Sequence, residues 1–254
     1  VIHLAAYKAA GESMIDPSKY SNNNLVGTLN LLNMCDKYGI KFFVFSSTAA
    51  VYGVPKYTPL NEKHSIDPIN YYGESKYQIE RNLQWFSKLK GIRFASLRYF
   101  NAAGYDVMGR ITSREQNPQN LIPIIMEVAN RERKTLEVYG ADYKTKDGTG
   151  IRDYIHVSDL SSAHIKAMDY ISQNNKDIIL NLGTGKGNSV FDIIKKVEKI
   201  TKRKISYKIV GRRNGDTSTI LASAEEANKI LNWKPKCSDL DTIISSTWNI
   251  YDKN

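Results

Sequence analysis

The 254-residue sequence contains few cysteines and no long apolar segment. Its two cysteines, Cys35 and Cys237, are too few for a disulfide framework or for a zinc site built from cysteines. The longest apolar candidate, residues 121–129, contains Glu127 and is far shorter than the roughly 20 residues that cross a bilayer. No Asn-x-Ser/Thr glycosylation site occurs either. The few cysteines and the lack of a glycosylation site favour a cytoplasmic protein.

The sequence also lacks an initiating methionine. It opens on the apolar run Val1–Ala6, which we interpret as a buried strand. A strand that begins at the first residue suggests a cut through the middle of a fold. Any targeting segment would then lie upstream of Val1.

The charge is unbalanced, with a formal net charge of +10. The composition, 41% hydrophobic and 10% aromatic, suits a globular protein with a core and excludes a mainly disordered chain. The densest basic cluster, residues 195–204, accompanies apolar residues at helical spacing, so its lysines belong on the solvated side of an ordinary helix. No nucleic-acid-binding motif is present. We therefore expect a phosphate-bearing small ligand and no nucleic-acid or membrane partner.

The first hundred residues alternate between strand and helix patterns. Strands are predicted at 1–6, 41–46 and 92–100, and helices at about 16–38 and 72–89. The 41–46 segment is almost wholly apolar, as is typical of a central parallel strand covered on both faces. The order predicts an α/β fold with a Rossmann-like, doubly wound parallel sheet.

After Phe100 the pattern changes to a second, smaller α/β region. We predict helices near 121–131, between 157 and 178, and at 189–201, 223–231 and 239–251, and strands at 136–139, 153–157 and 178–183. Residues 183–187 resemble a phosphate loop but lack its spacing, so we interpret them as a turn.

Tyr72 and Lys76 are four residues apart in the second predicted helix, and therefore share a face. A free tyrosine titrates near pH 10 and is a poor base at neutral pH, but a nearby ammonium favours the phenolate. Such a pair can serve as general base and acid on a sugar hydroxyl. The spacing alone is uninformative: Tyr52 and Lys56 repeat it across Gly53 and Pro55, where a helix is not expected.

The sequence before this helix supports a catalytic role for Tyr72 and Lys76. Ser46, Ser47 and Thr48 follow the apolar strand at its carboxyl end, where open α/β sheets bind ligands. A hydroxyl there could polarise a substrate hydroxyl held near Tyr72. The alternative is a plain polar strand end.

The sequence resembles the extended short-chain dehydrogenase/reductases, and within them the UDP-glucose (UDP-galactose) 4-epimerases. The resemblance covers essentially the whole chain and is carried, in order, by residues 1–13, Asn23-Asn24, 46–53, 72–76, 97–101, 120–123, 147–157, 181–183 and 212–216. The blocks at 97–101 and 147–157 are most similar to the epimerases. The Tyr-x-x-x-Lys pattern is shared with the wider superfamily.

The resemblance implies an isomerase of galactose metabolism that interconverts UDP-glucose and UDP-galactose through a 4-keto sugar with bound NAD. Tyr72 would take the proton of the sugar 4-hydroxyl, Thr48 would share its hydrogen bond, and Lys76 would hold the nicotinamide ribose and lower the pKa of Tyr72. Thr48 replaces the serine common in the family and keeps the hydroxyl. The implied cofactor-binding residues are Leu4, Ala5, Ala6, Lys8, Asn23, Thr48, Tyr72, Lys76, Tyr99 and Phe100.

The resemblance implies UDP-sugar contacts from Thr48, Tyr72, Asn101, Asn120, Leu121, Tyr139, Arg152, Arg213 and Asp216. These residue types suit the ligand, since arginines neutralise a diphosphate and a tyrosine can stack on uracil. Each also has a structural alternative: the arginines and Lys8 as surface residues, Asn120 as a helix cap, Tyr139 as core. His3 and His156 lie in apolar strands and are better interpreted as satisfied core histidines.

Three further expectations follow from the resemblance. The chain has neither the family's Gly-rich dinucleotide loop nor the acidic residue after it, so it is expected to begin at the family's fourth strand and, as a piece, to be inactive. Residues 1–100 would be the C-terminal part of the NAD-binding domain, and 101–254 mainly the nucleotide-sugar domain, with about 153–172 packing on the first. A homodimer through the helices at 16–38 and 72–89 is implied.

Other functions remain open. Ile220 stands where the family varies a residue near the sugar 2-substituent, which leaves UDP-N-acetylhexosamines open as substrates. A related 4,6-dehydratase or decarboxylase would carry an acidic residue just after the Ser/Thr of the strand-end motif, whereas Ala49 follows Thr48 here. A non-catalytic, RNA-binding protein on the same fold would have lost the catalytic residues, and all three are present.

Overall fold

The computed structural model describes residues 1–111, 113–213 and 215–252. The chain divides into two compact units. Unit 1 comprises Val1–Phe100, Ser162–Leu182 and Ser223–Trp233, and unit 2 comprises Asn101–Ser161, Gly183–Ala222 and Lys234–Asn254. Within the described residues, no helix is both long and apolar enough to cross a membrane.

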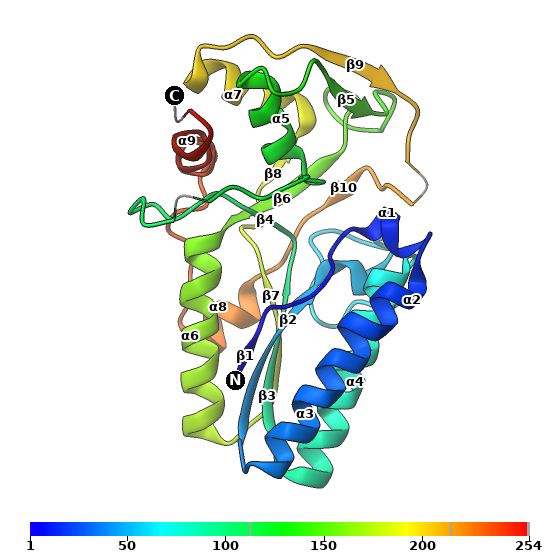
Figure 1. The fold of residues 1–254 in the computed structure, drawn as a ribbon, viewed down its shortest axis with the longest axis vertical. Helices are drawn as coiled ribbons and strands as arrows, with labels where there is room; N and C mark the ends of the chain where they lie inside the picture. The colour runs from blue at the N-terminus through cyan, green and yellow to red at the C-terminus, as the bar shows by residue number, and fades with distance from the viewer. Residues whose placement is uncertain (112, 214, 253–254) are drawn as a thin grey trace. The chain divides into compact units, whose positions relative to one another are not determined.

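Unit 1 is built on a four-stranded parallel sheet in the order β1-β2-β3-β7 (Figure 1). This confirms the Rossmann-like α/β prediction. Its strands are β1 (Ile2–His3), β2 (Phe42–Thr48), β3 (Arg93–Tyr99) and β7 (Ile178–Leu182). Its helical segments are α1 (Ala10–Ser13), α2 (Pro17–Tyr20), η1 (Ser21–Val26), α3 (Gly27–Lys37), η2 (Ala49–Tyr52), α4 (Tyr71–Lys90), α8 (Glu225–Leu231) and the part of α6 (Val157–Asn174) from Ser162 onward.

Helices α3 and α4 lie side by side on one face of this sheet, and α6 lies on the other (Figure 1). Apolar residues at helical spacing, such as Leu32, Ile79 and Leu83, pack against Phe43 and Phe45 of β2. Because both faces of the sheet are covered, its central strands are buried along almost their whole length. A ligand can therefore reach polar groups of this sheet at the ends of its strands.

Unit 2 contains two small sheets and a helical layer (Figure 1). Its strands are β4 (Asn101–Ala103), β5 (Leu136–Tyr139), β6 (Ile151–His156), β8 (Gly187–Ser189), β9 (Tyr207–Val210) and β10 (Thr219–Ile220). Its helices are α5 (Leu121–Ala129), α7 (Val190–Thr201) and α9 (Leu240–Tyr251). These three helices pack on one another around a core that includes Ile125, Val197 and Trp248.

The predicted boundary at 100/101 coincides with the division between the two units. The later stretches of unit 1, 162–182 and 223–233, only partly overlap the segment expected to pack with the first domain, about 153–172, because β7 pairs with β3 and α8 packs on β7. The predicted strand at 1–6 ends at His3. Beyond it, the buried amide of Asn24 hydrogen-bonds both the N–H and the C=O of Tyr7 (2.9 Å each) and so replaces strand pairing.

Candidate functional site

The predicted catalytic residues lie at the carboxyl edge of the unit 1 sheet. Thr48 ends β2 and is in register with Tyr99 at the end of β3. Helix α4 begins nearby, because the Asn70 side chain accepts a hydrogen bond from Gly73 N (2.8 Å) and caps it. This cap places Tyr72 in the first turn of the helix.

Tyr72 is half-buried, and its surroundings shift its acidity in two directions. Burial raises the pKa of the Tyr72 phenol above its usual range, while a hydrogen bond with the Thr48 hydroxyl lowers it. Thr48 also accepts a hydrogen bond from Ala50 N (3.1 Å), which fixes its side chain. The phenol and the hydroxyl expected to bind the same sugar oxygen are therefore neighbours.

Lys76 follows Tyr72 by one helical turn and is only 2% exposed. Its Nζ donates to the Ser46 carbonyl (2.8 Å) and lies 4.7 Å from the ring centre of Phe45 and 5.9 Å from that of Tyr72. Burial lowers the pKa of Lys76 to about 8, and the nearby Glu80 carboxylate opposes this shift. Lys76 is thus an ammonium held at the same strand ends as the phenol.

The remaining residues expected to bind the cofactor also belong to unit 1. Leu4–Lys8 directly follow β1, Asn23 lies on η1, Tyr99 ends β3 and Phe100 follows it. The Tyr99 hydroxyl hydrogen-bonds the Ser46 hydroxyl, and its ring lies 6.1 Å from that of His164. Since the strands are parallel, these segments share one edge of the sheet.

Lys76 fits the ribose of a dinucleotide. An ammonium carries three protons. Within the described part of the chain, the hydrogen-bond acceptor of Lys76 is the Ser46 carbonyl, so protons remain for ribose hydroxyls. Lys76, with the residues after β1 and at the end of β3, would hold this part of a dinucleotide.

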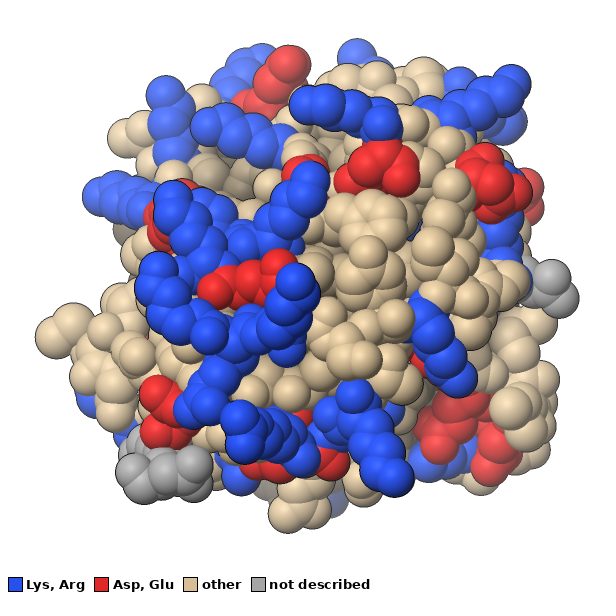
Figure 2. Space-filling model, turned by 90° about the horizontal axis from the view of Figure 1, so that it is seen from above, with Lys and Arg blue, Asp and Glu red and all other residues tan. Residues whose placement is uncertain are grey.

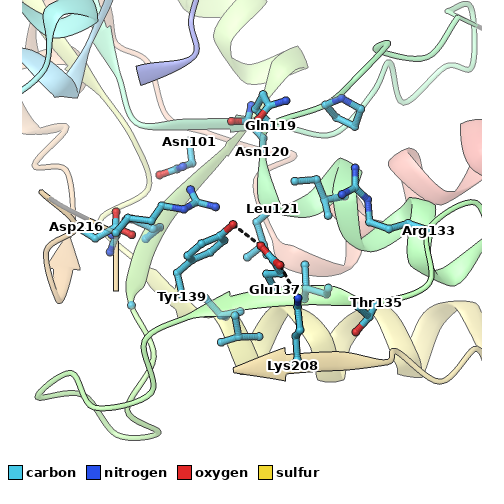
Figure 3. Close-up of a pocket in the computed structure, with 18 of the residues that line it drawn as sticks. Asn101, Gln119, Asn120, Leu121, Arg133, Thr135, Glu137, Tyr139, Lys208 and Asp216 are labelled. Carbon is cyan, nitrogen blue, oxygen red and sulfur yellow. Dashed lines mark hydrogen bonds and ion pairs between the residues drawn. The ribbon is translucent and has the colours of Figure 1, made fainter. Parts of the chain in front are cut away.

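In unit 2, a cavity of about 500 Å³ opens beside α5 and β5 (Figure 3). Seven of the residues expected to hold the nucleotide sugar line it: Asn101, Asn120, Leu121, Tyr139, Arg152, Arg213 and Asp216. They come from five separate stretches of sequence. Asn120 caps α5 without a side-chain hydrogen bond to the helix, which leaves its amide available to the cavity.

The Tyr139 ring is held from two sides. The Arg213 guanidinium lies 3.7 Å from the ring centre. The Tyr139 hydroxyl donates to the Glu137 carboxylate (2.6 Å), which also pairs with Lys208 (2.8 Å) (Figure 3). The ring is therefore fixed before any ligand binds.

Arginine and aspartate face each other elsewhere in the cavity. Arg152 and Asp216 lie 3.5 Å apart. The guanidinium groups of Arg152 and Arg213 suit a diphosphate, and the Asp216 carboxylate suits ribose hydroxyls.

The sequence patterns missed several residues of this cavity. Glu137, Lys208, Arg133, Thr135 and Gln119 line it and were not predicted. Alternation along β5 could have identified Glu137, because Leu136 and Val138 are buried while Glu137 and Tyr139 point to the other face. No comparable pattern marks Lys208 or Arg133. Ile220, on β10, is outside the set of residues that line the cavity.

Several structural alternatives are settled. His156 is fully buried with both ring nitrogens hydrogen-bonded, and His3 bonds Thr28, so both are satisfied histidines. The loop at 183–187 is a turn in which the N–H groups of Thr184 and Gly185 are already engaged, because the buried Asp153 carboxylate accepts from both (2.9 Å each at their shortest). Residues 53–56 are not helical.

The positive charge is distributed over a solvated surface. Lys195 and Lys204 are exposed, whereas Ile193, Ile194 and Val197 of the same segment are buried, as the sequence predicted. Figure 2 shows Lys and Arg gathered on part of the face in view, with Asp and Glu among them. Ion pairs such as Lys196–Asp241 (2.6 Å) account for part of this mixture.

Residues 1–183 match the family model described as the NAD dependent epimerase/dehydratase family. The chain is 43% identical over 248 residues to the UDP-glucose 4-epimerase of Streptococcus mutans, covering 98% of this chain and 74% of that protein. It is also 43% identical over 254 residues to the UDP-glucose 4-epimerase of Lacticaseibacillus casei, covering 100% and 77%.

Solved structures agree with the sequence relatives. The chain superposes with a TM-score of 0.96 on UDP-glucose 4-epimerase from Brucella ovis in complex with NAD, at 40% identity, covering 98% of this chain and 77% of that one. It superposes with a TM-score of 0.92 on the enzyme from Bifidobacterium longum in complex with NAD⁺ and UDP, at 41% identity, covering 100% and 76%.

Proposed function

Because this chain belongs to the NAD dependent epimerase/dehydratase family, we propose that it is an NAD-dependent enzyme that interconverts UDP-glucose and UDP-galactose at C4. The observation that carries the proposal is the placement of Tyr72 beside Thr48 at the strand ends, with the Lys76 ammonium one turn along the same helix. The reaction passes through a 4-keto sugar and involves no net oxidation.

The chain's own residues supply binding and proton transfer. Tyr72 accepts the proton of the sugar 4-hydroxyl and later returns it, while Thr48 holds that hydroxyl. Lys76 stabilises the phenolate form of Tyr72 by its charge. The chemistry that bound NAD would supply is reversible hydride transfer at the sugar carbon.

The cavity of unit 2 supports the choice of a UDP-sugar. Arg152 and Arg213 neutralise the diphosphate, Asp216 accepts from ribose hydroxyls, and Tyr139 stacks on the uracil. Ala49 after Thr48 favours epimerisation over dehydration or decarboxylation, because no carboxylate follows the hydroxyl in sequence.

The test is direct. Protein expressed from its complete coding sequence is mixed with UDP-galactose or with UDP-glucose, and the nucleotide sugars are separated by chromatography. Both reactions should reach the same mixture without consuming added NAD. A 6-deoxy-4-keto sugar would instead identify a dehydratase, and a pentose formed in a separate incubation with UDP-glucuronate would identify a decarboxylase. RNA binding that weakens with salt, without sugar conversion, would favour the binding protein.

We also propose a homodimer formed through α3 and α4. Large apolar side chains are exposed on these helices, including Met34, Trp85 and Leu89. Exposed apolar groups of this size mark protein contacts when they gather on one surface. Light scattering should give twice the chain mass for the wild type and the monomer mass for Trp85→Glu with Leu89→Glu; a monomeric wild type would disprove the dimer.

We place the protein in the cytoplasm. Cys35 and Cys237 are both free thiols, which suits a reducing compartment. Fractionation of the source cells with an antibody would test this placement, and recovery with a secreted fraction would contradict it.

A further inference from the structure

A buried ion pair lies one helical turn beyond Lys76. Glu80, on α4, and Arg98, on β3, are 1% and 4% exposed. Arg98 donates to the two carboxylate oxygens of Glu80, from Nη2 at 2.5 Å and from Nε at 2.9 Å. Ser47 and Ser96 add hydroxyl donors to the same carboxylate, at 2.6 and 2.9 Å.

The pair is held from its far side as well. The remaining guanidinium nitrogen of Arg98 donates to the Tyr52 hydroxyl (3.0 Å), which in turn donates to Asn181 Oδ1 (2.7 Å). Asn181 N donates to the half-buried Glu62 carboxylate (2.7 Å). This chain of bonds runs from β3 through η2 to β7, and it fixes the guanidinium and hence Glu80.

Stability alone does not explain such a pair. Desolvating two charges costs several kcal/mol per ion, and apolar residues of similar volume stabilise a core at least as well. What distinguishes this pair is its place on α4: Tyr72, Lys76 and Glu80 follow at intervals of four and therefore share one face of the helix.

The groups around Lys76 come from several elements. Burial and the charge of Lys76 lower the pKa of His3 on β1, and Tyr72 and Glu80 lie on the same helix as Lys76. Arg98 is linked to Lys76 through Glu80. Tyr99 bonds the hydroxyl of Ser46, the residue whose carbonyl accepts from Lys76. Of these, the Glu80 carboxylate is the group that favours the ammonium form of Lys76. Arg98 in turn limits how strongly that carboxylate acts.

We propose that Glu80 and Arg98 are a positioning pair that sets the charge of Lys76 at the strand ends. The Glu80 carboxylate keeps Lys76 an ammonium in its apolar surroundings, and the Arg98 network keeps that carboxylate in place. This inference rests on the proposed function only for its kinetic consequence, because the charge of Lys76 can be measured without turnover.

The first readout is the titration of Lys76 itself. NMR of protein labelled at the lysine Cε follows its deprotonation, and Lys76→Met assigns the signal. Glu80→Gln leaves the Arg98 charge uncompensated, so the midpoint should fall by about one to two pH units. Arg98→Gln leaves the Glu80 charge uncompensated, so the midpoint should rise.

The second readout is the pH profile of kcat for UDP-galactose. The high-pH limb should move with the Lys76 midpoint: to lower pH in Glu80→Gln and to higher pH in Arg98→Gln. Shifts of opposite sign are not expected from loosened packing, which would lower the rate at every pH.

Two further variants keep the test decisive. Each single variant leaves a buried charge without its partner and can unfold. The double variant, Glu80→Gln with Arg98→Gln, leaves no unpaired charge of this ion pair. In this double variant the Lys76 midpoint should fall, but by less than in Glu80→Gln. Asp159→Asn is the matched control, since it alters a buried carboxylate of unit 2 that accepts from Lys236 N and Cys237 N.

A Lys76 midpoint that stays at its wild-type value in the folded single and double variants would overturn the proposal. So would an equal shift in Asp159→Asn. If the titrations shift as expected but the wild type does not interconvert the sugars, the proposed function fails and the positioning pair stands.

Discussion

At the scale of single residues, Tyr72 is the most informative site to change. Tyr72→Phe keeps the ring and removes the group that exchanges the proton, so kcat should fall by about two to four orders of magnitude. Bound NAD should remain, because Lys76 is intact. Tyr71→Phe is the control on the same helix: the Tyr71 hydroxyl bonds Ser21, and its loss should leave kcat within about twofold. Near-normal turnover in Tyr72→Phe would remove this residue from the mechanism.

A second residue-scale prediction concerns the hydrogen bond from Tyr139 to Glu137. Tyr139→Phe removes the hydrogen bond to Glu137 while keeping the stacking face, so KM for UDP-galactose should rise about three- to tenfold with little change in kcat. Glu137→Gln retains an acceptor for the hydroxyl and loses the charge paired with Lys208, so its effect should be smaller. Steady-state kinetics separates the two parameters. An unchanged KM in Tyr139→Phe would show that this hydrogen bond does not contribute to substrate binding.

Site residues could be predicted from the sequence where they matched positions of a known family. The seven cavity residues were carried over from matching motifs, and the structure gathers them from distant stretches of sequence. Lys208 and Glu80 could not be found in this way. Lys208 reaches the cavity only because β9 pairs with β5, and Glu80 resembles an ordinary helix-surface carboxylate until Arg98 is placed opposite it.

At the scale of elements, long periodic segments were predictable and short ones were not. The helix predicted at 72–89 is α4 (Tyr71–Lys90), and the strand predicted at 136–139 is β5 (Leu136–Tyr139). Strands β4, β8 and β10 have two or three residues each, too few to show a period, and they exist through pairing with β6. The exposed β9 strand likewise depends on its partner β5.

Packing between α4 and η2 gives a prediction at this scale. Gly to Ala within a helix normally stabilises it, but a Cβ on Gly73 would lie 2.5 Å from the Ala50 carbonyl oxygen, which is backbone. Gly73→Ala should therefore destabilise the fold by about 1–3 kcal/mol. It should also lower kcat, because Gly73 and Ala50 adjoin the segments that carry Tyr72 and Thr48.

Gly27→Ala is the matched control for this contact. Gly27 begins α3, and the nearest atom to its added Cβ is the Asn22 oxygen at 3.8 Å, an ordinary contact. This variant should gain about 0.5–1 kcal/mol. Urea unfolding measures both, and equal effects of the same sign would contradict the packing argument.

At the scale of the whole molecule, the composition predicted a folded chain, but the route of the chain between units needed the structure. Residues 162–182 return to unit 1 because β7 completes the parallel sheet beside β3. Helical periodicity in this stretch is equally compatible with either unit. The identity of a sheet partner is a long-range property that local sequence patterns do not encode.

The stability of the molecule should depend on the neutral form of His156. This histidine is fully buried, its Nδ1 accepts from Ser158 N (3.0 Å), and its Nε2 lies 3.1 Å from the Ser246 hydroxyl. A ring nitrogen that accepts from a backbone N–H carries no proton, so the structure selects the neutral imidazole. Burial lowers the pKa of His156 below 6.5, although Asp159, Asp239 and Asp106 act in the opposite direction.

The sign of the pH effect follows from this shift. Between the lowered folded value and 6.5, the unfolded chain binds a proton that the folded chain does not, so the free energy of unfolding falls as the pH drops through 6.5. Urea unfolding at pH 7.5, 6.5 and 5.5 should show a steeper loss for the wild type than for His156→Gln, which cannot titrate. Comparing slopes removes the constant cost of the substitution and the contributions of other groups. Parallel pH dependence in the two proteins would mean that protonation of His156 costs the fold nothing, and that its hydrogen bonds tolerate the charged ring.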